Sequence, residues 1–178
     1  MFTVRSVVVT DRGRQDLLLD LLNSTPVSGG VAADSLVDPG EAASWQRAHG
    51  GSGSADERRS LVRARDVLQE VVRGSRPATA LEPLLEGVAA RPAVTGEGVS
   101  WELDVPAGGR LAVEAVLAWN TVRQSMPGRL RPCANPECRL FLIDRSKPNK
   151  ARWCSMAVCG NRMKARRHYQ RARDAAAG

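Results

Sequence analysis

Apolar positions in the first part of the chain recur with the spacing of amphipathic helices. Residues 13–24 contain five leucines, which predicts a helix with Asp20 and Asn23 on one shared face. Asp38 followed by proline is typical of a helix start, because Asp caps the first turn and proline fits the first helical position. This second helix carries Trp45, which we interpret as a core anchor, and is expected to end at the next glycine pair.

A third helix is predicted from Ser54 to about Gly74. Ser54 and Glu57 have the spacing of a capping box, in which each residue satisfies a backbone amide of the first turn. Its apolar stripe is expected to be buried, and consists of Leu61, Ala64, Leu68, Val71 and Val72. A similar box predicts a further helix over residues 79–92.

Alternating patterns predict a small amount of strand. Residues 2–10 are rich in β-branched side chains, and residues 99–105 alternate cleanly, which predicts a half-buried strand paired with residues 93–95. An apolar helix is expected over 109–126, before a Pro-Gly pair. Residues 1–128 therefore form an α+β domain, mainly helical with a small β-hairpin.

Composition excludes several classes of protein and divides the chain by charge. The 178 residues are 43% hydrophobic and 25% charged, and contain no stretch of roughly 18 apolar residues and no signal peptide, so we expect a cytoplasmic, membrane-free protein. Residues 1–128 carry 13 basic residues against 16 acidic ones, a net charge of −3, whereas residues 129–178 carry 13 against three, a net charge of +10. This asymmetry predicts a second domain that binds a polyanion.

All four cysteines lie in the basic segment, as two C-x4-C pairs separated by fifteen residues: Cys133, Cys138, Cys154 and Cys159. Four soft ligands in two pairs suit one tetrahedral Zn²⁺, and a closed set of thiolates predicts a structural site. Two disulfides, an iron–sulfur cluster and four free buried thiols are the alternatives. A segment this short buries little apolar area, so the metal would stabilise most of its fold.

The sequence between the cysteine pairs predicts a hairpin. Residues 140–143 are expected to form one strand, 145–150 a turn and 151–153 the return strand. Residues 161–173 contain neither glycine nor proline and predict a helix. A knuckle, a hairpin and a helix that carries the last ligand make a treble-clef-like zinc finger.

Basic side chains follow the hairpin and this helix. Like charges four residues apart destabilise a helix unless a partner of opposite charge compensates them. The density of these basic residues therefore predicts phosphate as a partner. Asn161 either reads adenine or braces the zinc knuckle, and Tyr169 either stacks on a base or packs in the core. The expected nucleic-acid contacts are Arg145, Lys147, Lys150, Arg152, Asn161, Arg162, Lys164, Arg166, Arg167 and Arg171.

The motif Cys-Gly-Asn-Arg at the end of residues 154–162, with the basic residues after it, resembles the CGNR zinc finger. Residues 133–138, with Phe141 and Asp144, match the first knuckle of that finger. Residues 19–24, Leu-Asp-Leu-Leu-Asn-Ser, resemble the Leu-Asp-x-x-Asn-Thr signature of the ABATE domain, which usually precedes this finger. The resemblance implies a stress-induced transcription regulator whose finger binds DNA.

We therefore expect a zinc-dependent transcription regulator whose finger helix docks on double-stranded DNA and which is nucleoid-associated when bound. RNA is the alternative partner, since phosphate attraction ignores the sugar. A lone finger buries little surface, which predicts a homodimer assembled by the N-terminal domain. Asp20, Asn23 and Trp45 are candidates for a small-molecule effector pocket in that domain. With two histidines in different modules and no Gly-rich phosphate loop, an enzyme is not expected.

Overall fold

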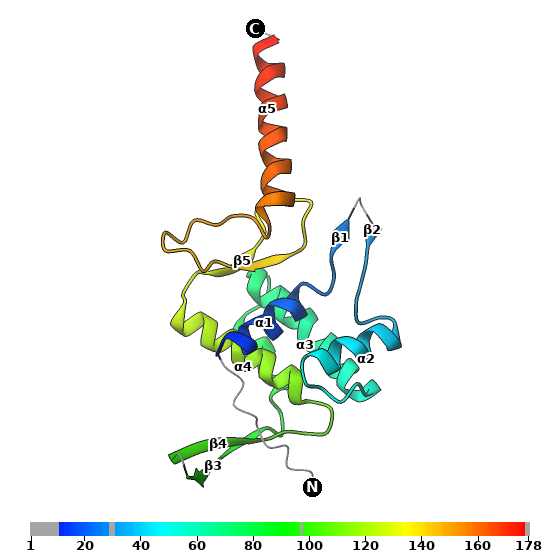
Figure 1. Ribbon diagram of the computed structural model, residues 1–178, viewed down its shortest axis with the longest axis vertical. Coiled ribbons are helices and arrows are strands. Elements are labelled where there is room, and N and C mark those ends of the chain that lie inside the picture. Colours follow the sequence, from blue (N-terminus) through cyan, green and yellow to red (C-terminus); the bar gives the residue numbers. More distant parts are fainter. Residues whose placement is uncertain (1–10, 29–30, 97, 177–178) are drawn as a thin grey trace.

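The first half of the chain is built mainly of helices (Figure 1). The computed structural model describes residues 11–28, 31–96 and 98–176, so the strand predicted for residues 2–10 lies outside the described residues. Its helices and strands up to residue 125 are α1 (Asp11–Leu22), β1 (Val27–Ser28), β2 (Val31–Ala32), α2 (Pro39–Ala48), α3 (Ala55–Arg73), the 3₁₀ helix η1 (Ala78–Leu84), β3 (Ala89–Thr95), β4 (Gly98–Asp104) and α4 (Arg110–Ser125).

The predicted caps are confirmed. The Asp38 carboxylate accepts hydrogen bonds from the amides of Gly40 and Glu41 at the start of α2. The Ser54 hydroxyl accepts from the Glu57 amide, while the Glu57 carboxylate accepts from the amides of the two residues before Ser54. Helix α3 ends at Gly74, whose φ of +78° is a left-handed conformation that glycine adopts without strain.

The helix predicted over residues 79–92 is wrong in length and type. Only the 3₁₀ helix η1 forms there, with Pro83 inside it, because proline removes a backbone donor that a longer α-helix needs. The chain then enters β3, which pairs antiparallel with β4 along its whole length, from Ala89 opposite Asp104 to Thr95 opposite Gly98. The predicted hairpin is thus confirmed and is longer than expected.

The expectation that this hairpin is half-buried is wrong. Directly opposed residues of an antiparallel pair point to the same side, and one side of the β3–β4 hairpin is entirely apolar. Yet most side chains on that face lie in solvent, since Val94 is 87% exposed, Val99 68% and Trp101 63%, while Leu103 is half-buried. In Figure 1 the hairpin extends away from the helices, so the rest of the described chain does not cover this face.

The hydrophobic core lies where α1, α3 and α4 pack together. Fully buried leucines from all three helices fill it, including Leu18, Leu61 and Leu111. The α3 stripe is confirmed at Leu61, Ala64 and Leu68, whereas Val71 and Val72 are only partly buried. None of the described helices has the length and apolar character to cross a membrane.

The basic C-terminal segment forms β5 (Leu130–Pro132), β6 (Phe141–Ile143), the π-helix η2 (Met156–Gly160) and α5 (Asn161–Ala176). The predicted strand over residues 151–153 is wrong, because β6 pairs with β5 and the hydrogen-bonding groups of Ala151 and Arg152 are used elsewhere. Helix α5 immediately follows η2 and projects from the body as a single helix (Figure 1). The α+β class predicted from the sequence is confirmed, with three small two-stranded sheets among the described residues.

Candidate metal centre and nucleic-acid interface

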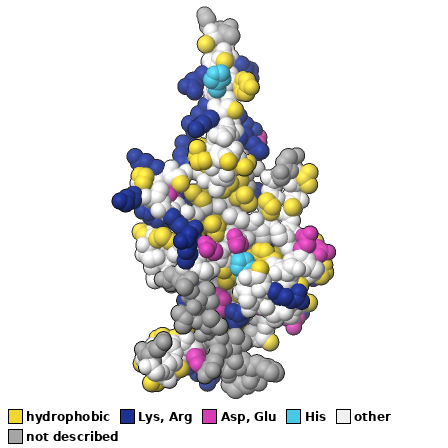
Figure 2. All heavy atoms as spheres, in the orientation of Figure 1, with side chains coloured by type: hydrophobic (Ala, Val, Ile, Leu, Met, Phe, Trp, Pro, Cys, Tyr) yellow, Lys and Arg dark blue, Asp and Glu magenta, His cyan; other side chains and the backbone are white. Residues whose placement is uncertain are grey.

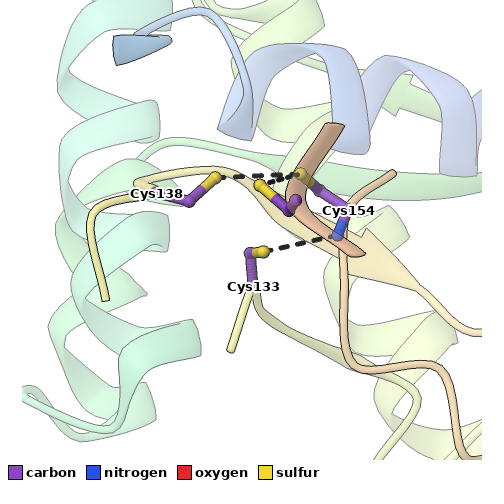
Figure 3. A group of neighbouring side chains, drawn as sticks. Cys133, Cys138 and Cys154 are labelled. Atoms are coloured by element: carbon purple, nitrogen blue, oxygen red, sulfur yellow. Dashed lines mark hydrogen bonds between the residues drawn. The ribbon is translucent and has the colours of Figure 1, made fainter. Parts of the chain in front are cut away.

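The four cysteine sulfurs converge on one point (Figure 3). Their ligand atoms all lie within 4.8 Å of one another, although the residues are spread over 27 positions of the chain. The Sγ atoms of Cys138 and Cys154 are 3.7 Å apart, as are those of Cys154 and Cys159. Four sulfurs at about 2.3 Å from a tetrahedral Zn²⁺ lie about 3.8 Å from one another, so the spacing fits this ion.

Neighbouring residues hold the sulfurs in place. The buried amide of Asn135 donates to Cys159 Sγ over 3.4 Å, and the backbone amide of Cys154 donates to Cys133 Sγ over the same distance. Both hydrogen bonds stabilise negative charge on sulfur and orient the ligands. At Gly160 a Cβ atom would lie 2.8 Å from Met156 Sδ and 3.2 Å from Trp153, which explains glycine after the last ligand.

Without a bound metal, burial and hydrogen bonding shift the pKa values of three of the four thiols. Burial raises the pKa of Cys138 to about 11 and that of Cys154 further still. Burial also acts to raise the pKa of Cys159, but the hydrogen bonds from Asn135 and the neighbouring thiols outweigh it and lower the pKa. A divalent cation at the centre ionises coordinated thiols, so zinc supplies the charge that these buried sulfurs otherwise lack.

Helix α5 carries most of the predicted nucleic-acid contacts into solvent. It contains six basic residues and one acidic residue, and its side chains are exposed from Asn161 to Ala175, with the exception of half-buried Met163. Figure 2 shows Lys and Arg side chains along this projecting helix and over the adjoining part of the body. At about 1.5 Å per residue its 16 residues span roughly 24 Å.

The surroundings of three side chains of α5 bear on the predicted roles. Arg166 pairs with Glu137 of the first knuckle, which lowers the pKa of that carboxyl. Asn161 donates to the carbonyl of Ala157 over 3.2 Å, one turn back in η2, so it makes no hydrogen bond to a cysteine in this structure. The expectation that Tyr169 packs in the core is wrong, since the residue is 70% exposed, with its ring edge-on to that of His168.

The four predicted nucleic-acid contacts between the cysteine pairs divide into two groups. Arg145 forms an ion pair of 2.8 Å with Asp16 of α1, which places it against the helical body. Lys147, Lys150 and Arg152 are exposed, and the Arg152 guanidinium lies 5.2 Å from the centre of the Trp153 ring. These three residues are available to a polyanion near the base of α5.

The comparisons with known proteins identify both parts of the chain. Residues 15–127 match the ABATE family model, described as "Putative stress-induced transcription regulator", and this match spans more than half of the chain. The chain belongs to the ABATE family. Residues 129–172 match the CGNR zinc finger, so the four cysteines form a single zinc site as predicted. Neither is an enzyme family, and no curated protein matches the chain.

The ABATE region and the CGNR finger are tied together by polar contacts. The side-chain amide of Asn23 in the ABATE region donates to the carbonyl of Phe141 over 3.2 Å and accepts from its amide over 2.7 Å. Arg73 places its guanidinium 4.4 Å from the centre of the Phe141 ring and donates to the Arg139 carbonyl. Phe141 and Ile143 also belong to the core that α1 and α4 build. The finger therefore shares its packing with the ABATE region.

Buried Asp144 organises the loop that carries the exposed lysines. Its carboxylate accepts hydrogen bonds from Ser146, from the Ala151 amide and from Arg131, at 2.6–2.9 Å. The hydrogen bonds from Ser146 lower the pKa of Asp144, and burial of the carboxylate acts in the opposite direction. With the further contributions of Ala151 and Arg131, the pKa falls from 3.8 to about 2. The charged form therefore stabilises the fold above pH 3.8, and this contribution is lost as the pH falls towards 2.

The Asp144→Asn variant is expected to lose stability at neutral pH, because the amide cannot accept all the hydrogen bonds that the carboxylate accepts. The free energy of unfolding of the wild type should approach that of the variant as the pH is lowered from 4 to 2. Urea unfolding at pH 7, 4 and 2.5 measures both chains, with the exposed Asp56→Asn as control. A difference between wild type and variant that is the same at all three values contradicts the assignment.

Two of the three candidates for an effector pocket meet at His49, and the third contacts Phe141. Trp45 lies against the His49 ring at 4.2 Å between centroids, and Asp20 lies 3.5 Å from His49 Nε2. Burial lowers the pKa of His49 and raises that of Asp20, so the imidazole is neutral at pH 7. Asn23 is engaged with Phe141 instead.

Two clefts of the ABATE region are lined by other residues. One cleft of about 670 Å³ at the start of α3 is lined by Asp34, Arg59 and Arg63, and another of about 810 Å³ lies between η1 and α4 beside Trp119. Neither is lined by Asp20, Asn23 or Trp45. The sequence analysis also gave no role to Asn135, although an amide within a C-x4-C pair lies close to the metal by its position alone.

Proposed function

We propose that the chain regulates transcription by binding double-stranded DNA through its zinc-dependent finger. The observation that carries the proposal is α5, a single helix that projects from the body with six basic residues against one acid. A helix that packs little against the body and carries a dense positive charge requires a negatively charged partner from outside the chain to stabilise it. Phosphate is the partner that matches both the charge and its spread over a length of roughly 24 Å.

Duplex DNA fits the helix better than RNA does. The major groove of B-form DNA is about 12 Å wide and admits an α-helix, whereas the major groove of duplex RNA is too narrow. Recognition of single-stranded RNA relies on stacking aromatic rings, and exposed Tyr169 is the single aromatic ring that α5 offers besides His168. RNA therefore remains the second candidate, supported by that one ring.

The proposal is tested by fluorescence anisotropy with the zinc-loaded full chain and a labelled 24-base-pair duplex. Binding is expected to weaken steeply with salt, with a log–log slope of about −0.9 for each phosphate contacted. The double variant Cys154→Ser plus Cys159→Ser serves as the zinc-deficient control and is expected to lose binding. The proposal is overturned if the wild type does not bind duplex DNA at 100 mM salt, or if it binds only RNA.

The ABATE region is proposed to receive a signal and to assemble the regulator as a homodimer. The exposed apolar face of the β3–β4 hairpin supports a second copy of the chain as its partner. Because this face carries no charge, the same face of two copies can pack together without electrostatic repulsion. A two-stranded hairpin with an open apolar face is marginally stable alone, and a dimer places two finger helices on one DNA site. The face consists of Ala90, Pro92, Val94, Val99, Trp101 and Leu103.

Replacement of Trp101 by glutamate is expected to dissociate this dimer. The substitution removes an aromatic side chain that anchors the interface and places a charge among apolar side chains. Together these changes raise the dissociation constant of the dimer by at least about tenfold. Sedimentation velocity over a concentration series measures it. Ser100→Glu, on the polar side of the same strand, is the matched control and should stay dimeric. A wild type that sediments as a monomer throughout rules out the proposed interface.

The remaining parts of the proposal concern the location of the protein in the cell and a small-molecule effector. We place the protein in the cytoplasm, associated with the nucleoid when bound to DNA, and assign it no catalytic role. Asp20 and Trp45, which meet at His49, are the residues proposed to contact a small effector. The link from Asn23 to Phe141 gives such a signal a direct route from the ABATE region to the finger.

A further inference from the structure

The exposed surface of α5 is divided into distinct faces. Residues of an α-helix follow one another by a rotation of about 100°. Half-buried Met163 marks the side of α5 that faces the body. Ala165 and Ala172 lie within about 20° of each other and about 160–180° from Met163 around the helix axis. The face on which they lie, with Asn161 at its N-terminal end, is therefore directed away from the protein.

Two basic rows border this outward face. Arg162 and Arg173 lie about 80–100° to one side of Ala172, and Lys164 and Arg171 lie at the same angle on the other side. All four side chains are exposed, and among the described residues none of the four forms an ion pair. Arg166, which also lies on the first side, is held by Glu137 of the knuckle.

We propose that α5 enters the major groove of DNA with the Asn161–Ala165–Ala172 face towards the base edges, an inference that rests on the proposed function. The helix with its side chains is about 10–12 Å across, and the groove is about 12 Å wide. With this face on the floor of the groove, the two basic rows point at the phosphates of its two walls. The alanines leave the middle of the face free of bulk and match the methyl group of thymine, while the exposed His168 and Tyr169 rings lie about 40° from the nearer alanine, one on each side.

Asn161 supplies the polar contact of this face. Its side-chain amide is exposed and donates only to the Ala157 carbonyl, so its carbonyl oxygen and second N–H are free among the described contacts. A side-chain amide pairs with the N6 and N7 atoms of adenine in the major groove. The face thus reads adenine–thymine pairs, while the rows beside it bind phosphate without regard to sequence.

The test separates the outward face from the side directed at the body. Zinc-loaded full-length Ala165→Phe and Ala172→Phe are measured by anisotropy on a 24-base-pair duplex selected from a random pool by the wild type. Each phenylalanine lifts the helix from the floor, and the dissociation constant should rise at least about tenfold, the loss of one good base contact. Gln170→Phe, on the opposite side and equally exposed, should bind within about twofold of the wild type.

The basic rows give a second readout. Arg173→Gln and Arg171→Gln, one from each row, should each make the log–log salt slope shallower by about one. A duplex of RNA with the same sequence should bind at least about tenfold more weakly. If the wild type binds duplex DNA but Ala165→Phe, Ala172→Phe and Gln170→Phe behave alike, the face assignment falls and the proposed function stands. If the wild type does not bind duplex DNA, both fall.

Discussion

Replacing Cys154 and Cys159 by serine is expected to remove the zinc of the CGNR finger and to unfold η2 and α5. Zinc binding contributes about 10–16 kcal/mol in isolated zinc fingers, which is as large as the whole free energy of unfolding of an ordinary domain. The end of the finger has little else to replace it, because α5 packs chiefly on η2, whereas β6 lies in the core shared with α1 and α4.

Native mass spectrometry measures this expectation, with one zinc per chain in the wild type and none in the double variant. Circular dichroism should report the loss of α5 in the variant at 25 °C. The control is Val158→Ser, an exposed position between the same two ligands, which should keep the zinc. A double variant that retains one zinc and a folded α5 contradicts the four-thiolate centre.

Truncation of Phe141 is expected to destabilise the whole protein and not only the finger. The ring is 1% exposed, packs in the core shared with α1 and α4, and lies under the Arg73 guanidinium. A buried Phe→Ala change costs about 3–5 kcal/mol, through lost burial and the cavity that remains. Because the core is shared, the ABATE region and the finger should unfold in one transition that shifts as a unit.

Differential scanning calorimetry of Phe141→Ala tests the shared core. Tyr169→Ala removes an aromatic ring from the exposed surface of α5 and should leave the transition within about 0.5 kcal/mol of the wild type. Two separate transitions in the wild type, of which only one moves in Phe141→Ala, would show that the two regions fold independently. That result would also remove the proposed route from Asn23 to the finger.

Local signals in the sequence predicted local structure well. The starts of α2 and α3 and the end of α3 depend on residues only a few positions apart, and their caps lie where Asp38, Ser54 and Gly74 indicated. The zinc centre was predictable for the same reason, since the spacing within each cysteine pair fixes most of its geometry. The α+β class followed from these elements and the alternation of β4.

Contacts between distant residues could not be predicted in this way. Asn23 was interpreted as a ligand contact, but its amide bonds to Phe141, which is 118 positions away. The partner of β6 is β5 and not residues 151–153, because buried Asp144 closes the intervening segment into a loop. Alternation in β4 predicted a buried face, yet no pattern shows whether another element covers it, and Trp101 lies in solvent.

Specific binding of duplex DNA by the zinc finger is best tested by selection from a random duplex library. The zinc-loaded full chain is incubated with the library and an excess of RNA at 150 mM salt, and the captured DNA is sequenced. We expect a recurring short motif that contains adenine–thymine pairs and disappears with the Cys154→Ser plus Cys159→Ser variant. Capture without any motif, or capture that the RNA abolishes, would contradict it.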